Sequence, residues 1–376
     1  SGRPTTHDDA PSRPSRGKTQ GVHTGISKSS PLEFATVDPA ELTALPEDAA
    51  RCRRGGRPVP SIVHQIWLGG WKMMYAKLLS VMSVHYLLRP ERHVLLYDTV
   101  PVDGKGVEWP EWRCACLLAR CERTTVPLSI AGRGFDDEAR VRQTYAKLRY
   151  ASDALGRCAN SQLDLLRLET LSQHGGLVLD LDVVVLRSLD AYRRCAADAV
   201  VGWGPQLSPR GGQVSSGVLI GRPDAHFYAS WRRRLLRGYD AGRTDFGRSC
   251  NVSTELALSR PRLVHAAPDL GPLPRFASRE LYDGYLEQAP LAHLSAFRHG
   301  WRLRDLMVHR SLEKIAALVL AAANRSLSDA VTRGTDAGGG AAPEAASRTT
   351  QLRECVRTMQ EACWARPGGR CGIYGA

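Results

Sequence analysis

Two aspartates, Asp180 and Asp182, directly follow a short apolar run, 177–179 (Leu-Val-Leu), and are well placed to do chemistry. The run predicts a buried strand, which must end where two carboxylates meet solvent or a cation. Residues i and i+2 of an extended segment project to the same side. Two aspartates so placed can share one hard divalent cation and the phosphate oxygens that accompany it. The pattern therefore predicts a metal–diphosphate site.

A helix and a glycine pair precede this acidic pair. Apolar residues recur at helical spacing through 161–174, and Gly175 and Gly176 end the helix. Asp164 and Arg167 lie three residues apart in that helix, so they share one of its faces. Taken alone, these two residues are an ordinary surface ion pair; beside the acidic pair they become candidate site residues.

The remaining periodicity predicts the fold class. A β-branched and aromatic run at 62–68 predicts the first strand, and 92–97 predicts the second. Further strands are expected at 177–180, 183–186, 199–203 and 218–221, and helices at 72–88, 138–155, 161–174, 225–236 and 253–258. This order predicts an α/β domain with a Rossmann-like, largely parallel central sheet flanked by helices. Such sheets bind ligands beyond the carboxyl ends of their strands.

The charge of the chain invites a nucleic-acid interpretation that its distribution argues against. The 376 residues carry a formal net charge of +13, but only seven of the 51 basic residues are lysine and the arginines are scattered. Nucleic-acid grooves need dense basic runs interleaved with aromatic residues. We therefore expect no nucleic-acid partner and a solvated basic surface instead.

Composition divides the chain into three parts. Residues 1–57 are rich in Ser, Pro, Gly and Arg and are expected to be a disordered stem or linker. Residues 58–328 form the expected folded domain, and 329–376 are expected to be a Gly/Ala-rich linker and a Cys-containing tail. No apolar run of about 18 residues is present, as a membrane span would need. Because the chain begins at Ser1, we expect a fragment whose native N-terminal membrane anchor was removed.

Cysteine usage indicates an oxidising compartment. The ten cysteines are many for a cytosolic enzyme, and their even number permits a set of disulfides. Glycosylation sequons begin at Asn251 and Asn324. A zinc site is disfavoured because Cys114, Cys116 and Cys121 lack a second pair at finger or ribbon spacing. The secretory pathway is the expected location.

Two kinds of enzyme fit Asp180-x-Asp182 locally. In one, the pair binds a cation that neutralises the diphosphate of a departing sugar nucleotide. In the other, Asp180 is the nucleophile of a haloacid-dehalogenase-type phosphatase. That phosphatase pattern also needs a later lysine and a further acidic pair, whereas the only later lysine here is Lys314 and no Asp-Asp pair follows. A third interpretation is two exposed loop aspartates without a role.

The residues of the helix, the glycine pair and the acidic pair together resemble a family of sugar transferases. The shared residues are Asp164, Arg167, Gly175, Gly176, Asp180 and Asp182. The family is the DXD-containing, glycosyltransferase family 32-like group of the yeast initiating α-1,6-mannosyltransferase, inositol-phosphoceramide mannosyltransferases and animal α-1,4-galactosyltransferase. Clostridial glucosylating toxins are more distant relatives. Val178 replaces the family's usual tyrosine, and 62–67, 215–227 and 291–294 resemble flanking family segments.

The resemblance implies a GT-A fold over 58–328 and a retaining glycosyl transfer from a nucleotide-sugar, a UDP-hexose or GDP-mannose. It implies that Asp182 binds Mn²⁺ or Mg²⁺ directly, and that Asp180 contacts the metal through water or the donor ribose. It places Asp164 and Arg167 beside the donor sugar. Asp164 would accept hydrogen bonds from sugar hydroxyls, and Arg167 would bind diphosphate or orient a carboxylate.

The same resemblance suggests further contacts. Trp67 would stack on the nucleobase, with backbone contacts from Ile66 and Leu68. His293 or His299 would complete the metal shell or lie by the acceptor, which is a glycan, a glycolipid or a protein. Ser215 and Ser216 are weaker candidates. The implied location is the Golgi lumen, as a type II membrane protein, and the alternative is an inactive sugar- or protein-binding module on the same fold.

Overall fold

A computed structural model provides the fold. It describes residues 52, 55, 57–68, 70, 72–124, 161–204, 212–223, 225–240, 248–271, 288–294, 306–336 and 343–364. All of these belong to one compact unit, Thr36–Ala376, and a second unit, Ser1–Ala35, lies outside the described residues. The stem expected at 1–57 therefore falls almost wholly outside them, as do His299 and the helix expected at 138–155.

A seven-stranded sheet forms the centre of this unit, in the order β3-β2-β1-β4-β7-β6-β8. Its strands are β1 (Ile62–Trp67), β2 (Arg92–Tyr97), β3 (Arg120–Arg123), β4 (Gly176–Leu179), β6 (Ala199–Gly204), β7 (Gln213–Gly221) and β8 (Val264–Ala267). All neighbouring pairs are parallel except the two made by β7. The prediction of an α/β fold with a largely parallel sheet is confirmed.

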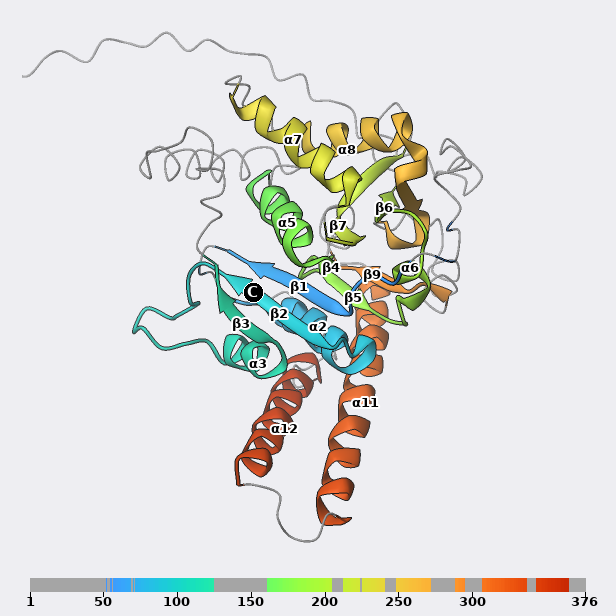
Figure 1. Cartoon of the computed structure of the whole chain (residues 1–376). Coiled ribbons are helices and arrows are strands. Elements are labelled where there is room, and N and C mark those ends of the chain that lie inside the picture. Colours follow the sequence, from blue (N-terminus) through green and yellow to red (C-terminus); the bar gives the residue numbers. More distant parts are fainter. Residues whose placement is uncertain are drawn as a thin grey trace, which may run out of the picture. The chain divides into compact units, whose positions relative to one another are not determined.

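Helices cover both faces of the sheet (Figure 1). They are α2 (Tyr75–Ser83), α3 (Pro110–Leu118), α5 (Ser161–His174), α7 (His226–Asp240), α8 (Arg248–Ser259), α11 (Leu306–Asp336) and α12 (Pro343–Trp364). One apolar core gathers residues of α5, α7 and α8, and a second gathers residues of α2, α3, α11 and α12. A third lies around β4, β7 and the small antiparallel sheet of β5 (Val183–Val185) and β9 (Leu291–His293).

Several predicted boundaries match closely. The second predicted strand and the predicted helix at 161–174 have the observed bounds of β2 and α5. The helix expected at 72–88 is divided into α2 and a π-helical turn, Val84–Leu88. The strand expected at 218–221 starts five residues earlier, because β7 continues along β6 beyond a register shift after Val201.

The C-terminal region differs from its prediction. A linker was expected from 329, yet α11 runs without a break to Asp336, and α12 follows. Alanine is the strongest helix former, so the Ala-rich composition that suggested a linker instead favours helix. Val319 and Leu320 of α11 and Met359 of α12 are buried in the core shared with α2 and α3.

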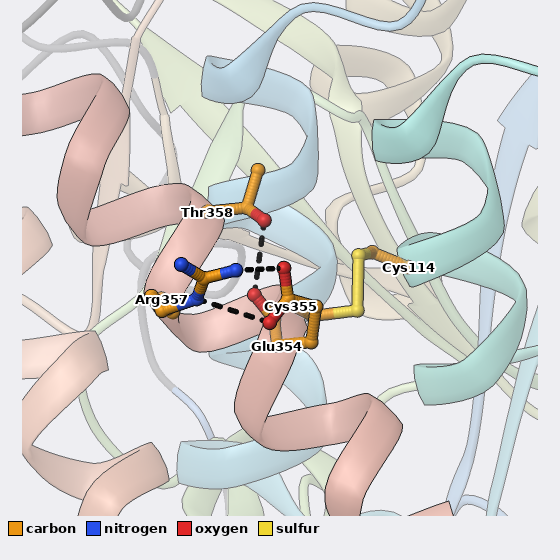
Figure 2. The surroundings of a disulfide bond; sticks show 5 residues. All are labelled: Cys114, Glu354, Cys355, Arg357 and Thr358. Atoms are coloured by element: carbon orange, nitrogen blue, oxygen red, sulfur yellow. Dashed lines mark hydrogen bonds and ion pairs between the residues drawn. A yellow bond between two sulfur atoms is a disulfide. The ribbon is translucent and has the colours of Figure 1, made fainter.

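The described residues include three disulfides, two of which connect distant parts of the chain. Cys114 of α3 is bonded to Cys355 of α12, which ties the C-terminal helix to the sheet-covering layer (Figure 2). The other pairs are Cys52–Cys195 and Cys116–Cys121. The disulfide expectation is confirmed, and the three cysteines considered for zinc are all in disulfides. Among the described residues, no helix is long and apolar enough to cross a membrane.

Candidate functional site

The glycine pair sets the path from α5 into β4. Gly175 and Gly176 have φ values of +63° and +99°, which side chains other than hydrogen rarely allow. A Cβ on Gly175 would lie 2.5 Å from Pro223 Cδ, and one on Gly176 would lie 2.4 Å from the carbonyl oxygen of Ile62. The Gly175 N–H donates to the Leu171 carbonyl at 2.9 Å and closes the helix. Only glycines fit here, as the motif predicted.

The acidic pair lies in a tight turn rather than in an extended segment. β4 ends at Leu179, and the Val183 N–H donates to the Asp180 carbonyl at 2.9 Å. The expectation that both carboxylates share one side of a strand is therefore corrected: a four-residue turn, 180–183, sets their directions. The Asp180 N–H donates to the Gly217 carbonyl at 2.9 Å, and the Asp182 carbonyl accepts from the Leu294 N–H at 2.6 Å. We call 180–183 the acidic turn.

Arg167 joins α5 to the acidic turn. Its guanidinium donates to Asp164 on its own helix, to Asp180, and to Ser216 Oγ at 3.1 Å. Asp164 and Arg167 are 2% and 3% exposed, so neither is a surface residue. Burial opposes the charge of Arg167, but the two carboxylates outweigh it and raise its pKa. The structure thus brings together Asp164, Arg167 and Asp180, and the guanidinium acts here as an orienting group for carboxylates.

The charge balance at Asp180 favours a bound cation. Burial raises the pKa of Asp180, and repulsion from Asp182 adds to that shift. Arg167 and, more weakly, Lys77 of α2 oppose it. A divalent cation beside the two aspartates would relieve their repulsion and favour their ionised forms.

His293 lies beside the acidic turn. It pairs with Val183 in the β5–β9 ladder, and the nearby Asp182 favours its protonated form, although burial lowers its pKa overall. Its Nε2 donates to the Leu270 carbonyl at 3.1 Å. A Cβ on Gly217 would lie 3.3 Å from Asp180 Oδ2 and 3.6 Å from His293 Cε1, so both side chains approach this glycine.

The donor set suits a metal that the substrate helps to bind. Among the described residues, no three His, Cys, Asp or Glu side chains group closely enough to hold a metal by themselves. The structure therefore does not bring the side chains of Asp180, Asp182 and His293 close enough to bind one metal ion directly. The metal role of His293 stays a prediction. Two hard carboxylates with open positions fit Mg²⁺ or Mn²⁺, which are commonly bound by one or two carboxylates plus substrate phosphates.

The residues expected to contact the nucleobase lie at the carboxyl end of β1. His64 pairs with Val178 in the parallel ladder, so two residues further on Ile66 is level with Asp180. Trp67 pairs with Tyr97 and packs partly on the core of α2 and α3, whereas Ile66 packs on the opposite core. Leu68 is half-buried directly after the strand. Their position fits a nucleotide site, and the base-stacking role of Trp67 stays a prediction.

Sequence reasoning missed the partners of the acidic turn. Ser80 Oγ donates to the Val183 carbonyl at 2.5 Å, and the Gln65 side chain donates to Ser80 Oγ at 2.8 Å. Ser216, a weak candidate, contacts Arg167. A signal was available, since Gln65 and Ser80 are polar residues within apolar runs where every buried polar group needs a partner. The direction of those partners depends on tertiary structure.

Comparison with known families agrees with this geometry. The family described as "Glycosyltransferase sugar-binding region containing DXD motif" matches residues 133–198, which contain α5, the glycine pair and the acidic turn. A search of curated protein sequences returned no match. The matched region is similar to the sugar-binding region of DXD-containing glycosyltransferases and agrees with the first interpretation of Asp180-x-Asp182, a sugar-nucleotide site.

Solved structures of glycosyltransferases are also similar to the chain. The PaToxG glycosyltransferase is 13% identical with a TM-score of 0.40, covering 71% of this chain and 90% of that one. The galactosyltransferase LgtC, in complex with donor and acceptor sugar analogues, is 15% identical with a TM-score of 0.34, covering 69% and 95%. The glycosyltransferase GlyE of Streptococcus pneumoniae TIGR4 is 10% identical with a TM-score of 0.35, covering 72% and 64%.

Proposed function

We propose that the chain is a metal-dependent, retaining hexosyltransferase that uses a UDP-hexose or GDP-mannose. The acceptor would be a hydroxyl group of a glycan, a glycolipid or a protein. The observation that carries the proposal is the buried Asp164–Arg167–Asp180 cluster next to Asp182, at the carboxyl edge of a parallel sheet and within the matched sugar-binding region. Open parallel sheets bind nucleotides at this edge.

Each residue of the cluster would have a separate task. Asp182 would bind the cation directly, and Asp180 would contact it through water or hold the donor ribose. Arg167 would hold the Asp180 and Asp164 carboxylates in place, since its own hydrogen bonds go to these two groups. A bound Mn²⁺ or Mg²⁺ would supply positive charge against the leaving diphosphate. Asp164 would hold Arg167 in place from the buried end of the cluster.

Retention is what the family resemblance implies, and the lack of an available nucleophile in this cluster favours front-face attack over a covalent glycosyl-enzyme as the retaining route. Asp164 and Asp180 are both engaged by Arg167, which weakens either carboxylate as an attacking group. The acceptor hydroxyl would attack from the face that the diphosphate leaves, while the pocket holds it against the anomeric carbon. The departing phosphate would take the hydroxyl proton.

The compartment belongs to the same proposal. Three disulfides support an oxidising location, and we place the protein in the secretory pathway as a Golgi-lumen type II membrane protein. The sequon asparagines Asn251 and Asn324 are both exposed on helices, as glycan attachment requires.

Titration calorimetry with a panel of UDP- and GDP-sugars tests the proposal. The wild-type chain should bind one nucleotide class in Mn²⁺ and lose that affinity in EDTA. Asp182→Asn should lose the metal-dependent part of the affinity, whereas Asp190→Asn, an exposed aspartate paired with Arg193, should retain it. No binding of any donor in either condition would refute the proposal.

A further inference from the structure

A series of hydrogen-bonded, buried polar side chains leads from β2, the strand next to the edge strand β3, to the acidic turn. His93 of β2 donates from Nε2 to Gln65 Oε1 at 3.0 Å, and Gln65 of β1 donates from Nε2 to Ser80 Oγ at 2.8 Å. Ser80 of α2 then donates to the Val183 carbonyl at 2.5 Å and lies 3.4 Å from the Asp180 carbonyl. Three side chains, from β2, β1 and α2, therefore lead to the two ends of one turn.

The hydrogen bonds of this series all run in the same direction, from His93 toward the acidic turn. Burial lowers the pKa of His93 to about 3, so its imidazole is neutral and its single N–H lies on Nε2, facing Gln65. Gln65 then has its oxygen accepting and its amide donating, which fixes the orientation of the amide. The Ser80 hydroxyl oxygen accepts from Gln65, and its proton is donated to the Val183 carbonyl of the acidic turn. One arrangement of protons satisfies these three hydrogen bonds, and His93 Nδ1 is left as a buried acceptor without a hydrogen-bond partner among the described residues.

Ser80 departs from the usual behaviour of a helical serine. Such a hydroxyl normally donates back to a carbonyl of its own helix, as Ser83 does to the Ser80 carbonyl at 2.7 Å. Ser80 instead donates across to 183, and Gln65 and Ser80 are both 0% exposed. Buried polar groups are costly unless paired, so a hydrogen-bonded network of this kind holds the groups it joins in one geometry.

We infer that Gln65 and Ser80 are positioning residues that hold the backbone of the acidic turn and thereby aim Asp180 and Asp182. The role of the two aspartates as metal ligands rests on the proposed function. The restraint of the turn backbone by Gln65 and Ser80 rests on the hydrogen bonds alone. Partners that orient metal ligands commonly change metal affinity about 10-fold or more when they are removed. Both residues would act through the carbonyls of 180 and 183, which Ser80 approaches directly and Gln65 reaches through Ser80.

The structure offers a matched pair of variants for the test. Ser80→Ala and Ser83→Ala each remove one fully buried hydroxyl from α2. Ser83 Oγ accepts from the Val185 N–H at 2.9 Å in β5, outside the acidic turn. Two measurements are made on both variants. One is amide hydrogen exchange across 180–186, and the other is the affinity for Mn²⁺, alone and with UDP or GDP present, measured from the electron paramagnetic resonance of free Mn²⁺.

The inference predicts that Ser80→Ala speeds exchange at the Val183 amide and weakens Mn²⁺ binding by about 10-fold. Ser83→Ala should speed exchange at Val185 and change Mn²⁺ affinity by less than about 2-fold. Equal effects of the two variants on the turn and on Mn²⁺ would overturn the inference. So would unchanged exchange at Val183 in Ser80→Ala.

Two other outcomes, a Ser80→Ala variant that does not fold and a wild-type chain that does not bind Mn²⁺, are also decisive. If Ser80→Ala does not fold, Gln65→Met removes the amide that orients the Ser80 hydroxyl, and it must speed exchange at Val183 for the inference to stand. If the wild-type chain binds no Mn²⁺ either alone or with UDP or GDP present, the proposed function fails, while exchange at Val183 still decides whether Ser80 holds the turn.

Discussion

Arg167 of α5 forms a direct ion pair with Asp180, the first residue after β4, and its guanidinium also binds Asp164. This ion pair joins the helix α5 to the end of β4, the two elements that Gly175 and Gly176 connect. Asp164 and Arg167 are buried, and 29% of the Asp180 side chain is exposed at the sheet edge. The cluster is therefore anchored at one end and accessible at the other, as a binding site for an anionic donor with its cation requires.

Replacing Arg167 should destabilise the fold as well as the site. Arg167→Met removes the partner of a buried carboxylate, and breaking a buried pair from one side typically costs about 3 kcal/mol of unfolding free energy. Urea unfolding of the variant measures this loss. Arg357→Met is the control, because Arg357 pairs with Glu354 and Glu361 on an exposed helix face (Figure 2 shows the Glu354 pair). The control should unfold almost as the wild type does, and equal losses in both variants would contradict the buried-pair account.

Gly176 should not tolerate a side chain. Gly176→Ala would place a Cβ 2.4 Å from a backbone oxygen of β1 at a positive φ, so the strand pair must shift. The expected loss is about 2 kcal/mol of unfolding free energy. Gly104→Ala, where a Cβ meets nothing within 4 Å, is the matched control and should be close to neutral. A neutral Gly176→Ala in the same urea titration would show that this backbone path is wrong.

Buried histidines should make the fold sensitive to mild acid. Burial lowers the pKa of His64 from 6.5 to about 4, so the folded chain keeps it neutral while the unfolded chain protonates it. Because the unfolded state binds the extra proton, stability is unaffected above about pH 6.5 and is lost as pH falls from there toward 4.

The size of this effect is measurable on one variant. His64→Gln retains a donor for the Gly175 carbonyl and does not titrate. Between pH 6 and 5 it should reduce the pH dependence of the unfolding free energy by about 1.2 kcal/mol per pH unit. Guanidinium unfolding at a series of pH values provides the comparison. An unchanged slope would mean that His64 is not neutral in the folded chain.

The disulfide between α3 and α12 should contribute more to stability than the one between α3 and β3. Cys114–Cys355 closes 241 residues, whereas Cys116–Cys121 closes five. In the chain-entropy account these correspond to about 5 and about 2 kcal/mol. Unfolding of the two double Ser variants, Cys114→Ser/Cys355→Ser and Cys116→Ser/Cys121→Ser, tests the order. A larger loss in the second variant would contradict it.

The parts of the fold that were predictable have local causes. The bounds of β2 and α5 follow from apolar periodicity, and the glycine pair from the need to leave a helix through positive φ. The candidate residues of α5 and the acidic turn were recognisable because their spacing is short. The structure brings three of them, Asp164, Arg167 and Asp180, into one cluster.

The parts that were not predictable depend on distant pairing. The length of β7 depends on its pairing with β4 and β6. A period-two pattern within the strand therefore could not show that it begins at Gln213. The helices after 306 were not recognised in full because an Ala-rich composition occurs both in linkers and in helices. Ser80 meets a carbonyl 103 residues later, and no local pattern identifies that partner.

Turnover of sugar nucleotides tests the central claim most directly. Release or transfer of the sugar is measured for each UDP- and GDP-sugar with the wild-type chain, Asp182→Asn and Asp190→Asn, in Mn²⁺ and in EDTA. The account predicts turnover of one donor by the wild type and Asp190→Asn, only in Mn²⁺, and none by Asp182→Asn. Equal turnover by Asp182→Asn, turnover that persists in EDTA, or no turnover of any donor would contradict it.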